Sequence, residues 1–81
     1  MKVEVKLFAV AKQLAGAEAI SIELPAAATV QDLRNGIAAQ HTELQDIIAR
    51  AMIAINAEYV SNAASVPDNC EIALIPPVSG G

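Results

Sequence analysis

The chain has 81 residues, of which 54% are hydrophobic, and five Lys and Arg residues against nine Asp and Glu give it a formal net charge of −4. This length allows one domain near the lower limit for a self-sufficient core. The acidic balance argues against nucleic acid or an anionic membrane as a partner, because both require basic patches, and it suits a positively charged protein surface. The hydrophobic fraction exceeds the usual value of about 45–50%, which indicates some apolar surface that faces a partner.

The single cysteine, Cys70, cannot form an internal disulfide, which indicates a reducing intracellular compartment. The N-terminus alternates charged with apolar residues and is unlike a secretory signal. No stretch approaches the roughly 18 consecutive apolar residues that span a bilayer. We therefore expect a cytoplasmic domain.

The first strand is predicted by strict alternation over residues 2–8. Lys2, Glu4 and Lys6 fall on one face and apolar residues on the other, which is the pattern of a half-buried strand. By the same parity Phe8 falls on the charged, outward face. A large aromatic residue there is more informative than one in the core.

A short helix and a second strand should follow. The i, i+4 spacing of Val10 and Leu14, with Gly16 placed as a C-cap, predicts two helical turns over residues 9–15. Residues 20–24 alternate again, which predicts a strand. With so short a helix between them, the first two strands are expected to pair as antiparallel neighbours.

The main helix is predicted to begin at Thr29, because Asp32 three residues later resembles a capping box. It should run to about Gln40. Gly36 in its interior weakens it by about 1 kcal/mol relative to alanine. Its apolar stripe at helical spacing consists of Val30, Leu33 and Ile37.

The second half of the chain is predicted to contain short elements. Asn56 tolerates the left-handed geometry of a tight turn, and the final strand is apolar on both faces, as expected of a central strand. These elements are a helical turn over 44–48, a strand over 52–55, a turn at 56–58, a return strand at 59–60, a loop over 61–69 and a final strand over 70–75.

This order predicts an α+β fold in which one main helix packs across a small mixed sheet, with short additional helices. Placing the two terminal strands side by side and parallel in the centre gives the β-grasp, or ubiquitin-like, topology. We expect residues 1–75 to form this domain and residues 76–81 to form an extended, flexible tail.

The tail is the most unusual stretch of the sequence. Paired prolines favour extended backbone, and glycines without a Cβ can pass through a channel too narrow for other residues. Six extended residues reach at most about 20 Å, enough to carry the terminal carboxylate into another protein. The alternative is an ordinary frayed chain end. The tail residues are Pro76, Pro77, Val78, Ser79, Gly80 and Gly81.

Two motifs resemble the small subunit of molybdopterin synthase. Phe8-Ala9, followed after two residues by Lys12-Gln13-Leu14 and then Gly16, is similar to the FAxxREL-G stretch of that family, and the PPVSGG ending is similar to its PPV-(small)-GG terminus. Lys12 replaces the usual Arg and gives up the bidentate fork of a guanidinium group. Weaker matches are Asn56, the Tyr59-Val60 pair and the helix start near Thr29-Val30.

This resemblance implies that the Gly81 carboxylate is the working group. An E1-like adenylyltransferase would consume ATP to make an acyl-adenylate, and sulfur would replace AMP to leave a thiocarboxylate. The tail, from Pro77 through Val78, Ser79 and Gly80, would enter the large subunit of the synthase and donate sulfur to precursor Z (cyclic pyranopterin monophosphate). The resemblance also implies a heterotetramer. The chain alone would catalyse nothing and would bind no cofactor or metal.

A partner surface is suggested by parity and by the resemblance together. Phe8 and Ile75 both fall on the outward faces of their strands, so parallel pairing would bring them close, and Tyr59 would complete an apolar patch. In the family, the matching positions dock partners, and Lys12 would contribute there. The alternative is that Phe8 and Ile75 only cover core at an edge of the sheet.

Other residues are weaker candidates. His41 lacks a second ligand at metal spacing, and Cys70 is expected to be a small buried hydrophobe. Besides molybdopterin synthesis, the tail is compatible with sulfur carriage for thiamine or tRNA thiolation. It is also compatible with a ubiquitin-like modifier joined through Gly81 to lysines. A plain β-grasp interaction module is the remaining alternative.

Overall fold

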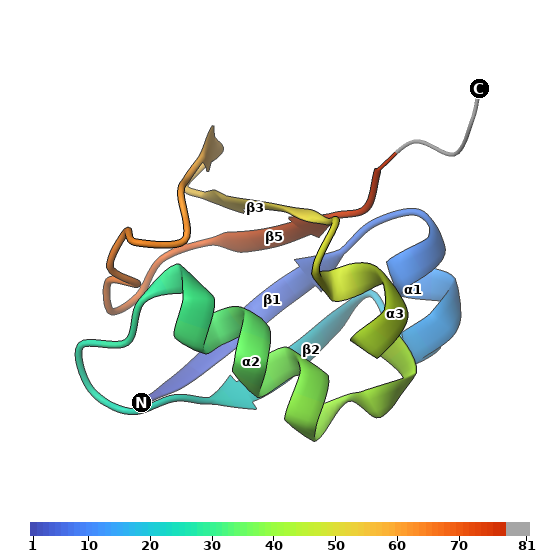
Figure 1. The fold of residues 1–81 in the computed structure, drawn as a ribbon, viewed down its shortest axis with the longest axis horizontal. Helices are drawn as coiled ribbons and strands as arrows, with labels where there is room; N and C mark the ends of the chain where they lie inside the picture. The colour runs from blue at the N-terminus through green and yellow to red at the C-terminus, as the bar shows by residue number, and fades with distance from the viewer. Residues whose placement is uncertain (78–81) are drawn as a thin grey trace.

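The computed structural model describes residues 1–77 as one sheet with helices on one side (Figure 1). No helix in this range is long and apolar enough to cross a membrane. The strands are β1 (Lys2–Leu7), β2 (Ala19–Glu23), β3 (Met52–Ile55), β4 (Glu58–Tyr59) and β5 (Ile72–Ile75). The helices are α1 (Val10–Ala15), α2 (Val30–Gln40), the 3₁₀ helix η1 (Thr42–Leu44) and α3 (Gln45–Ile48).

The sheet has the order β2-β1-β5-β3-β4 within the described residues. The first and last strands lie side by side in its centre and run parallel, with Leu7 opposite Leu74. The other pairs, β1 with β2, β5 with β3 and β3 with β4, are antiparallel. The predicted α+β class and β-grasp topology are therefore confirmed.

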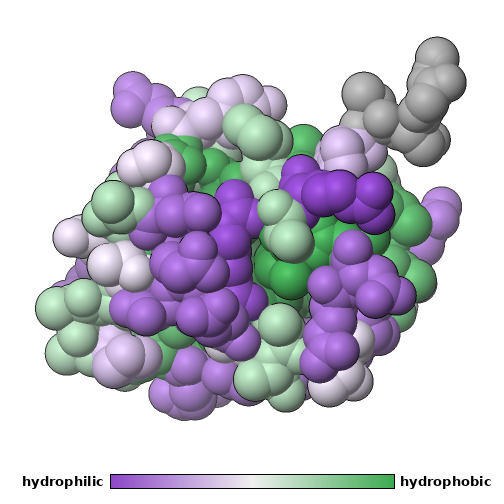
Figure 2. Space-filling model, viewed as in Figure 1, coloured by the Kyte–Doolittle hydropathy of each residue, from purple (hydrophilic) through white to green (hydrophobic). Residues whose placement is uncertain are grey.

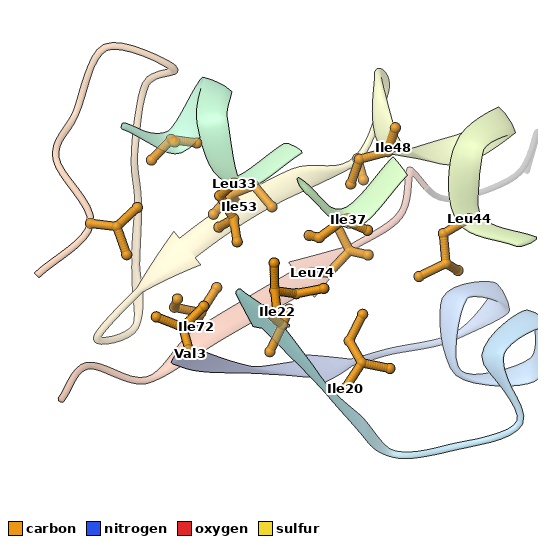
Figure 3. Close-up of a cluster of buried hydrophobic side chains, with 14 of the residues drawn as sticks. Val3, Ile20, Ile22, Leu33, Ile37, Leu44, Ile48, Ile53, Ile72 and Leu74 are labelled. Carbon is orange, nitrogen blue, oxygen red and sulfur yellow. The ribbon is translucent and has the colours of Figure 1, made fainter. Parts of the chain in front are cut away.

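The core lies between the sheet and α2 (Figure 3). Alternate residues of β1 are buried, as the period of two predicts, and Leu33 and Ile37 of α2 point toward them. Neither aromatic side chain is buried, so the described core is built from aliphatic residues alone. On the helical side, hydrophilic residues cover most of the surface seen in the same view (Figure 2).

The capping box at the start of α2 is present as predicted. The Asp32 backbone N–H donates to the Thr29 hydroxyl oxygen at 3.2 Å, and the Thr29 backbone N–H donates to an Asp32 carboxylate oxygen at 2.9 Å. These bonds satisfy two N–H groups that a helix start otherwise leaves unpaired. The predicted bounds of the main helix are correct at both ends.

Arg34 of α2 fixes the segment that leads into β3. One guanidinium nitrogen, Nη1, donates to the carbonyl oxygens of Ile48 at 2.6 Å and Ala51 at 2.8 Å. Nε donates to Asn62 Oδ1 at 2.8 Å, which ties the 61–69 loop to the same helix. One side chain thus holds the start of β3 and the loop before β5 against α2.

The structure explains why a glycine stands at position 36 inside α2, despite its poor helix propensity. A Cβ at this position would lie 3.1 Å from Ile22 Cγ2 and 3.3 Å from Leu24 Cδ2. Both neighbours are buried, and both distances are shorter than ordinary van der Waals contact, so an added Cβ would press against the packed core. The glycine therefore allows α2 to approach β2 closely, at the expense of helix propensity.

Gly36→Val is expected to destabilise the fold by about 1–3 kcal/mol, because extra methyl groups overpack this contact. Chemical denaturation would measure the change in the free energy of unfolding. Ala39→Val is the matched control, since Ala39 is exposed on the same helix. Equal stability losses in the two variants would show that the close approach of α2 to β2 at Gly36 does not explain the loss.

Several predicted details differ from the structure, including the return strand, which was predicted over 59–60 and is Glu58–Tyr59. The helix predicted from the spacing of Val10 and Leu14 is present as α1, but these two side chains are 39% and 44% exposed, and the residue that α1 buries is Ala11. The strand predicted over 20–24 is Ala19–Glu23, and the strand predicted over 70–75 begins only at Ile72. Gly16, in contrast, is the C-cap expected, with φ 68° and its N–H bonded to the Lys12 carbonyl at 2.9 Å.

Candidate functional site

The sheet face opposite α2 carries a row of residues contributed by four strands. Lys6 of β1 lies opposite Ala73 of β5, which lies opposite Ala54 of β3, which in turn lies opposite Tyr59 of β4. Ala54 is buried but is not part of the main core cluster. Ala73 and Ala54, in the middle of this row, have small side chains, so the outward face of the sheet is shallow there.

A second row of larger apolar residues borders the first. Ile75 of β5 lies opposite Met52 of β3. On the other side of β5, Leu7 of β1 lies opposite Leu74, so the residues that follow them, Phe8 and Ile75, continue this register. Phe8 is 47% and Met52 46% exposed, while Tyr59 on the first row is 64% exposed. Exposed apolar surface of this kind on one face of a small domain is typical of interaction sites, and the role of this face stays a prediction.

An open concavity of about 340 Å³ lies on this face, and Phe8, Tyr59 and Ile75 all line it, whereas Met52 does not. The structure therefore brings together the three residues predicted to form an apolar patch. Their role in partner binding stays a prediction. The remaining residues that line this concavity, called here the docking surface, are Lys6, Ala54, Ala57, Glu71, Ile72 and Ala73.

Lys6 and Glu71 form the polar rim of the docking surface. Lys6 Nζ lies 3.1 Å from Glu71 Oε1, and both side chains are more than half exposed, so this ion pair contributes little to stability. The Glu71 backbone N–H donates to Asn56 Oδ1 at 3.0 Å, and the Asn56 N–H donates to the Glu71 carbonyl at 2.8 Å. Asn56 thus holds the β3–β4 turn against the strand that carries Ile75.

Sequence reasoning missed part of this surface. The alternation of the first strand predicts only an outward, charged face for Lys6. The sequence pattern gave no role to Ala54, which lines the docking surface, or to Met52, which borders it. The alternation of β3 was the available signal, because it places Met52 and Ala54 on the side opposite the buried Ile53. The contribution of Glu71 depends on pairing between residues far apart in the sequence, which a local pattern does not reveal.

Lys12 lies beside the docking surface and does not line it. Its Nζ is 3.3 Å from Glu18 Oε1, and both side chains are more than half exposed. Lys12 instead lines a neighbouring concavity of about 500 Å³ that shares Lys6 and Phe8 with the docking surface. Lys12 thus places a cation, paired with Glu18, beside the docking surface, and its role in partner binding stays a prediction.

The chain leaves β5 directly next to the docking surface. Ile75 ends the strand, Pro76 is buried, and Pro77 is exposed. Pro77 is thus accessible for the passage role predicted for it. The remaining tail predictions, at Val78, Ser79, Gly80 and Gly81, lie outside the described residues.

Cys70 and His41 do not line the docking surface. Burial raises the pKa of the Cys70 thiol, a backbone hydrogen bond lowers it, and the nearby Asp68 carboxylate raises it. The thiol is only partly buried, not fully as expected, and Sγ donates to the Pro67 carbonyl at 3.2 Å. His41 caps the end of α2, with Nδ1 3.3 Å from Glu43 Oε2. No group of three or more potential metal ligands occurs within residues 1–77.

Because the pKa of Cys70 is raised, the folded protein should react with iodoacetamide at pH 8 more slowly than the chain unfolded in denaturant. Because the thiol pKa is higher in the folded than in the unfolded chain, the neutral thiol contributes to folding stability at pH values below the ordinary thiol pKa. This contribution to stability should be lost as pH rises through the folded-state pKa. Equal alkylation rates of the folded and unfolded chain would contradict this prediction. Cys70→Ala should remove the alkaline loss of stability.

Comparison with known proteins agrees with the sequence motifs. A protein of Chlamydomonas reinhardtii named molybdopterin synthase sulfur carrier subunit is 35% identical over 83 aligned residues that cover both chains completely. The crystal structure of SAMP1 from Haloferax volcanii superimposes with a TM-score of 0.86 at 27% identity, covering both chains completely. Subunits 1 and 2 of the molybdopterin-converting factor from Helicobacter pylori form a solved complex. One chain of it matches with a TM-score of 0.67, 29% identity and complete coverage of both chains.

The resemblance to the molybdopterin synthase small subunit, first indicated by the residues around Phe8 and by the Gly-Gly ending, is therefore confirmed. The family model that matches covers residues 5–81, which is nearly the whole chain, and includes both motifs. The chain belongs to the ThiS family.

Proposed function

We propose that this chain is the sulfur carrier subunit of a molybdopterin synthase and that it delivers sulfur on its C-terminal glycine. The observation that carries the proposal is the position of Ile75, which lines the apolar docking surface and directly precedes the tail ending in Gly80-Gly81. A partner seated on this surface would have the tail beside it. The name of the Chlamydomonas relative supports the same function.

The first step is docking. Phe8, Tyr59 and Ile75 offer apolar anchors around a shallow floor, and Lys6, Lys12 and the rim carboxylate of Glu71 offer charges at the margin. Interfaces are commonly arranged in this way, with aromatic anchors inside a polar rim. The solved complex of two converting-factor subunits supports the large subunit of the synthase as the partner.

The second step is activation of the tail. A carboxylate is a poor electrophile because its oxygen is a poor leaving group. An E1-like adenylyltransferase would let the Gly81 carboxylate attack the α-phosphorus of ATP, with loss of pyrophosphate. A sulfur nucleophile would then attack the carbonyl carbon of the acyl-adenylate, AMP would leave, and a thiocarboxylate would remain.

The third step is transfer. The thiocarboxylate sulfur is a strong nucleophile that must be shielded from water until it is delivered. Inside the large subunit it would attack a carbon of precursor Z and form a C–S bond as the oxygen substituent on that carbon leaves. Hydrolysis of the resulting thioester would leave the sulfur on the pterin and return the Gly81 carboxylate. Glycines at the end of the tail suit a narrow channel, because they have no side chain to exclude.

A second candidate is a ubiquitin-like modifier, favoured by the similarity to SAMP1, the small archaeal modifier protein 1 of Haloferax volcanii. The same activated Gly81 would then form an isopeptide bond with a lysine of a target protein. Sulfur carriage for thiamine or tRNA thiolation is a further alternative within the same chemistry. All of them share the acyl-adenylate and differ in the nucleophile that consumes it.

Reconstitution tests the proposed function. The chain would be incubated with the E1-like enzyme, ATP and a sulfur donor, and then with the large subunit and precursor Z. We expect molybdopterin to form in proportion to the amount of this chain supplied. Failure to form molybdopterin, with adducts appearing on protein lysines instead, would favour the modifier.

A further inference from the structure

The turn between β1 and α1 contains a backbone conformation that an L-residue rarely adopts. Ala9 has φ 53° and ψ −128°, and the Ala11 N–H donates to the Phe8 carbonyl at 3.1 Å. These values match the first central position of a type II′ turn, which normally requires glycine. An alanine there is strained, because its Cβ crowds the backbone.

This strained turn is held at both ends. Leu7, before Phe8, is only 3% exposed, and Ala11, after the turn, is fully buried. The two buried residues fix the entry to and the exit from the turn, which is how a strained conformation persists in a fold. Phe8 and Ala9 lie between these anchors and are both exposed.

The strained residue also lies at the docking surface. Phe8 lines both the docking surface and the neighbouring concavity that contains Lys12, and Ala9 lines the second of these. A glycine would relax the turn, yet the chain carries an alanine that removes backbone freedom next to an exposed aromatic side chain. Strain that persists beside a binding surface is commonly linked to pre-organisation.

We propose that Ala9 is a positioning residue for partner docking, which holds Phe8 pointing outward before the large subunit binds. The inference rests on the proposed function, since it needs a partner that seats on Phe8. Glycine at this position would relieve the strain but would let the turn sample other conformations, and the partner would then have to order them. Stability and binding should therefore change in opposite directions.

The test is Ala9→Gly, compared with the unchanged chain. We expect its thermal midpoint to rise, because glycine removes the strain. Its affinity for the large subunit should fall by about three- to tenfold, because the partner must then order the Phe8 side chain on binding. Amide relaxation measurements should show larger backbone mobility at residues 8–10. Unchanged affinity, or a lower thermal midpoint, would overturn the proposal.

Ala27→Gly is the matched control, because Ala27 also has positive φ, at 61°, and is exposed in the turn before α2. It should gain stability without losing affinity. Replacing Ala9 by its D-enantiomer through chemical ligation should also raise the midpoint, since D-residues favour positive φ. It should keep the affinity, because the turn stays restricted. Loss of affinity with the D-residue would overturn the positioning role.

Phe8→Ala separates this inference from the proposed function. If Phe8→Ala weakens binding and Ala9→Gly does not, only the positioning role is wrong. If neither variant weakens binding, the docking surface itself is wrong at Phe8, and the positioning role falls with it.

Discussion

Deletion of Gly81 is expected to abolish sulfur transfer while leaving the domain folded. The shortened chain still ends in a glycine carboxylate, at Gly80, but that carboxylate lies about 3.3–3.6 Å short of the original position. Because transfer requires the reacting sulfur to sit within about 3–3.5 Å of its target, a displacement of this size removes the productive geometry. Molybdopterin formation should fall to the level seen without the chain.

Stability provides the control for this deletion. The described hydrophobic core extends from Val3 to Leu74, so removing the last residue should leave the thermal midpoint unchanged. Binding of the large subunit should persist as well, because the docking surface is intact. If sulfur transfer survives the deletion, the terminal carboxylate is not the carrier group.

Phe8→Asp is expected to weaken binding of the large subunit by about 30-fold or more, the loss typical of a central aromatic anchor at about 2 kcal/mol. The carboxylate would also have to be desolvated against the apolar side chains of Tyr59 and Ile75, which adds to the loss. Isothermal titration calorimetry would measure the affinity. Since Phe8 is 47% exposed, the fold should tolerate the change.

Leu14→Asp is the matched control, because Leu14 is 44% exposed but lines neither the docking surface nor the neighbouring concavities. Its affinity should stay within about threefold of the unchanged chain, as expected of a residue outside the anchor cluster. Equal losses in Phe8→Asp and Leu14→Asp would mean that the partner binds the α1 side of the domain instead.

Most of the fold could be predicted because its determinants are local. The alternation of β1 and the Thr29–Asp32 capping box each depend on neighbours in the sequence, and both are present in the structure. The apolar character of the last strand indicated a central position, and placing it parallel to the first strand gave the β-grasp topology. The outward positions of Phe8 and Ile75 then followed from strand parity and the parallel pairing, and the docking surface could be anticipated from them.

The rest depends on contacts between distant parts of the chain. Val10 and Leu14 have a helical spacing, but the residues of α1 that pack against the core are Ala11, which is fully buried, and Ala15. Helix propensity makes Gly36 unfavourable, and only its close contact with the side chain of Ile22, which is distant in the sequence, explains the glycine. The conformation of Ala9 carries no sequence signal, because alanine is the residue that such a turn disfavours.

The central claim is that the Gly81 carboxylate carries sulfur, and intact-mass spectrometry with C-terminal fragmentation tests it most directly. After incubation with the E1-like enzyme, ATP and a sulfur donor, the account predicts the mass gain of one oxygen replaced by sulfur, located on Gly81. An unchanged mass in the presence of an active E1-like enzyme, or sulfur located on Cys70 instead, would contradict it.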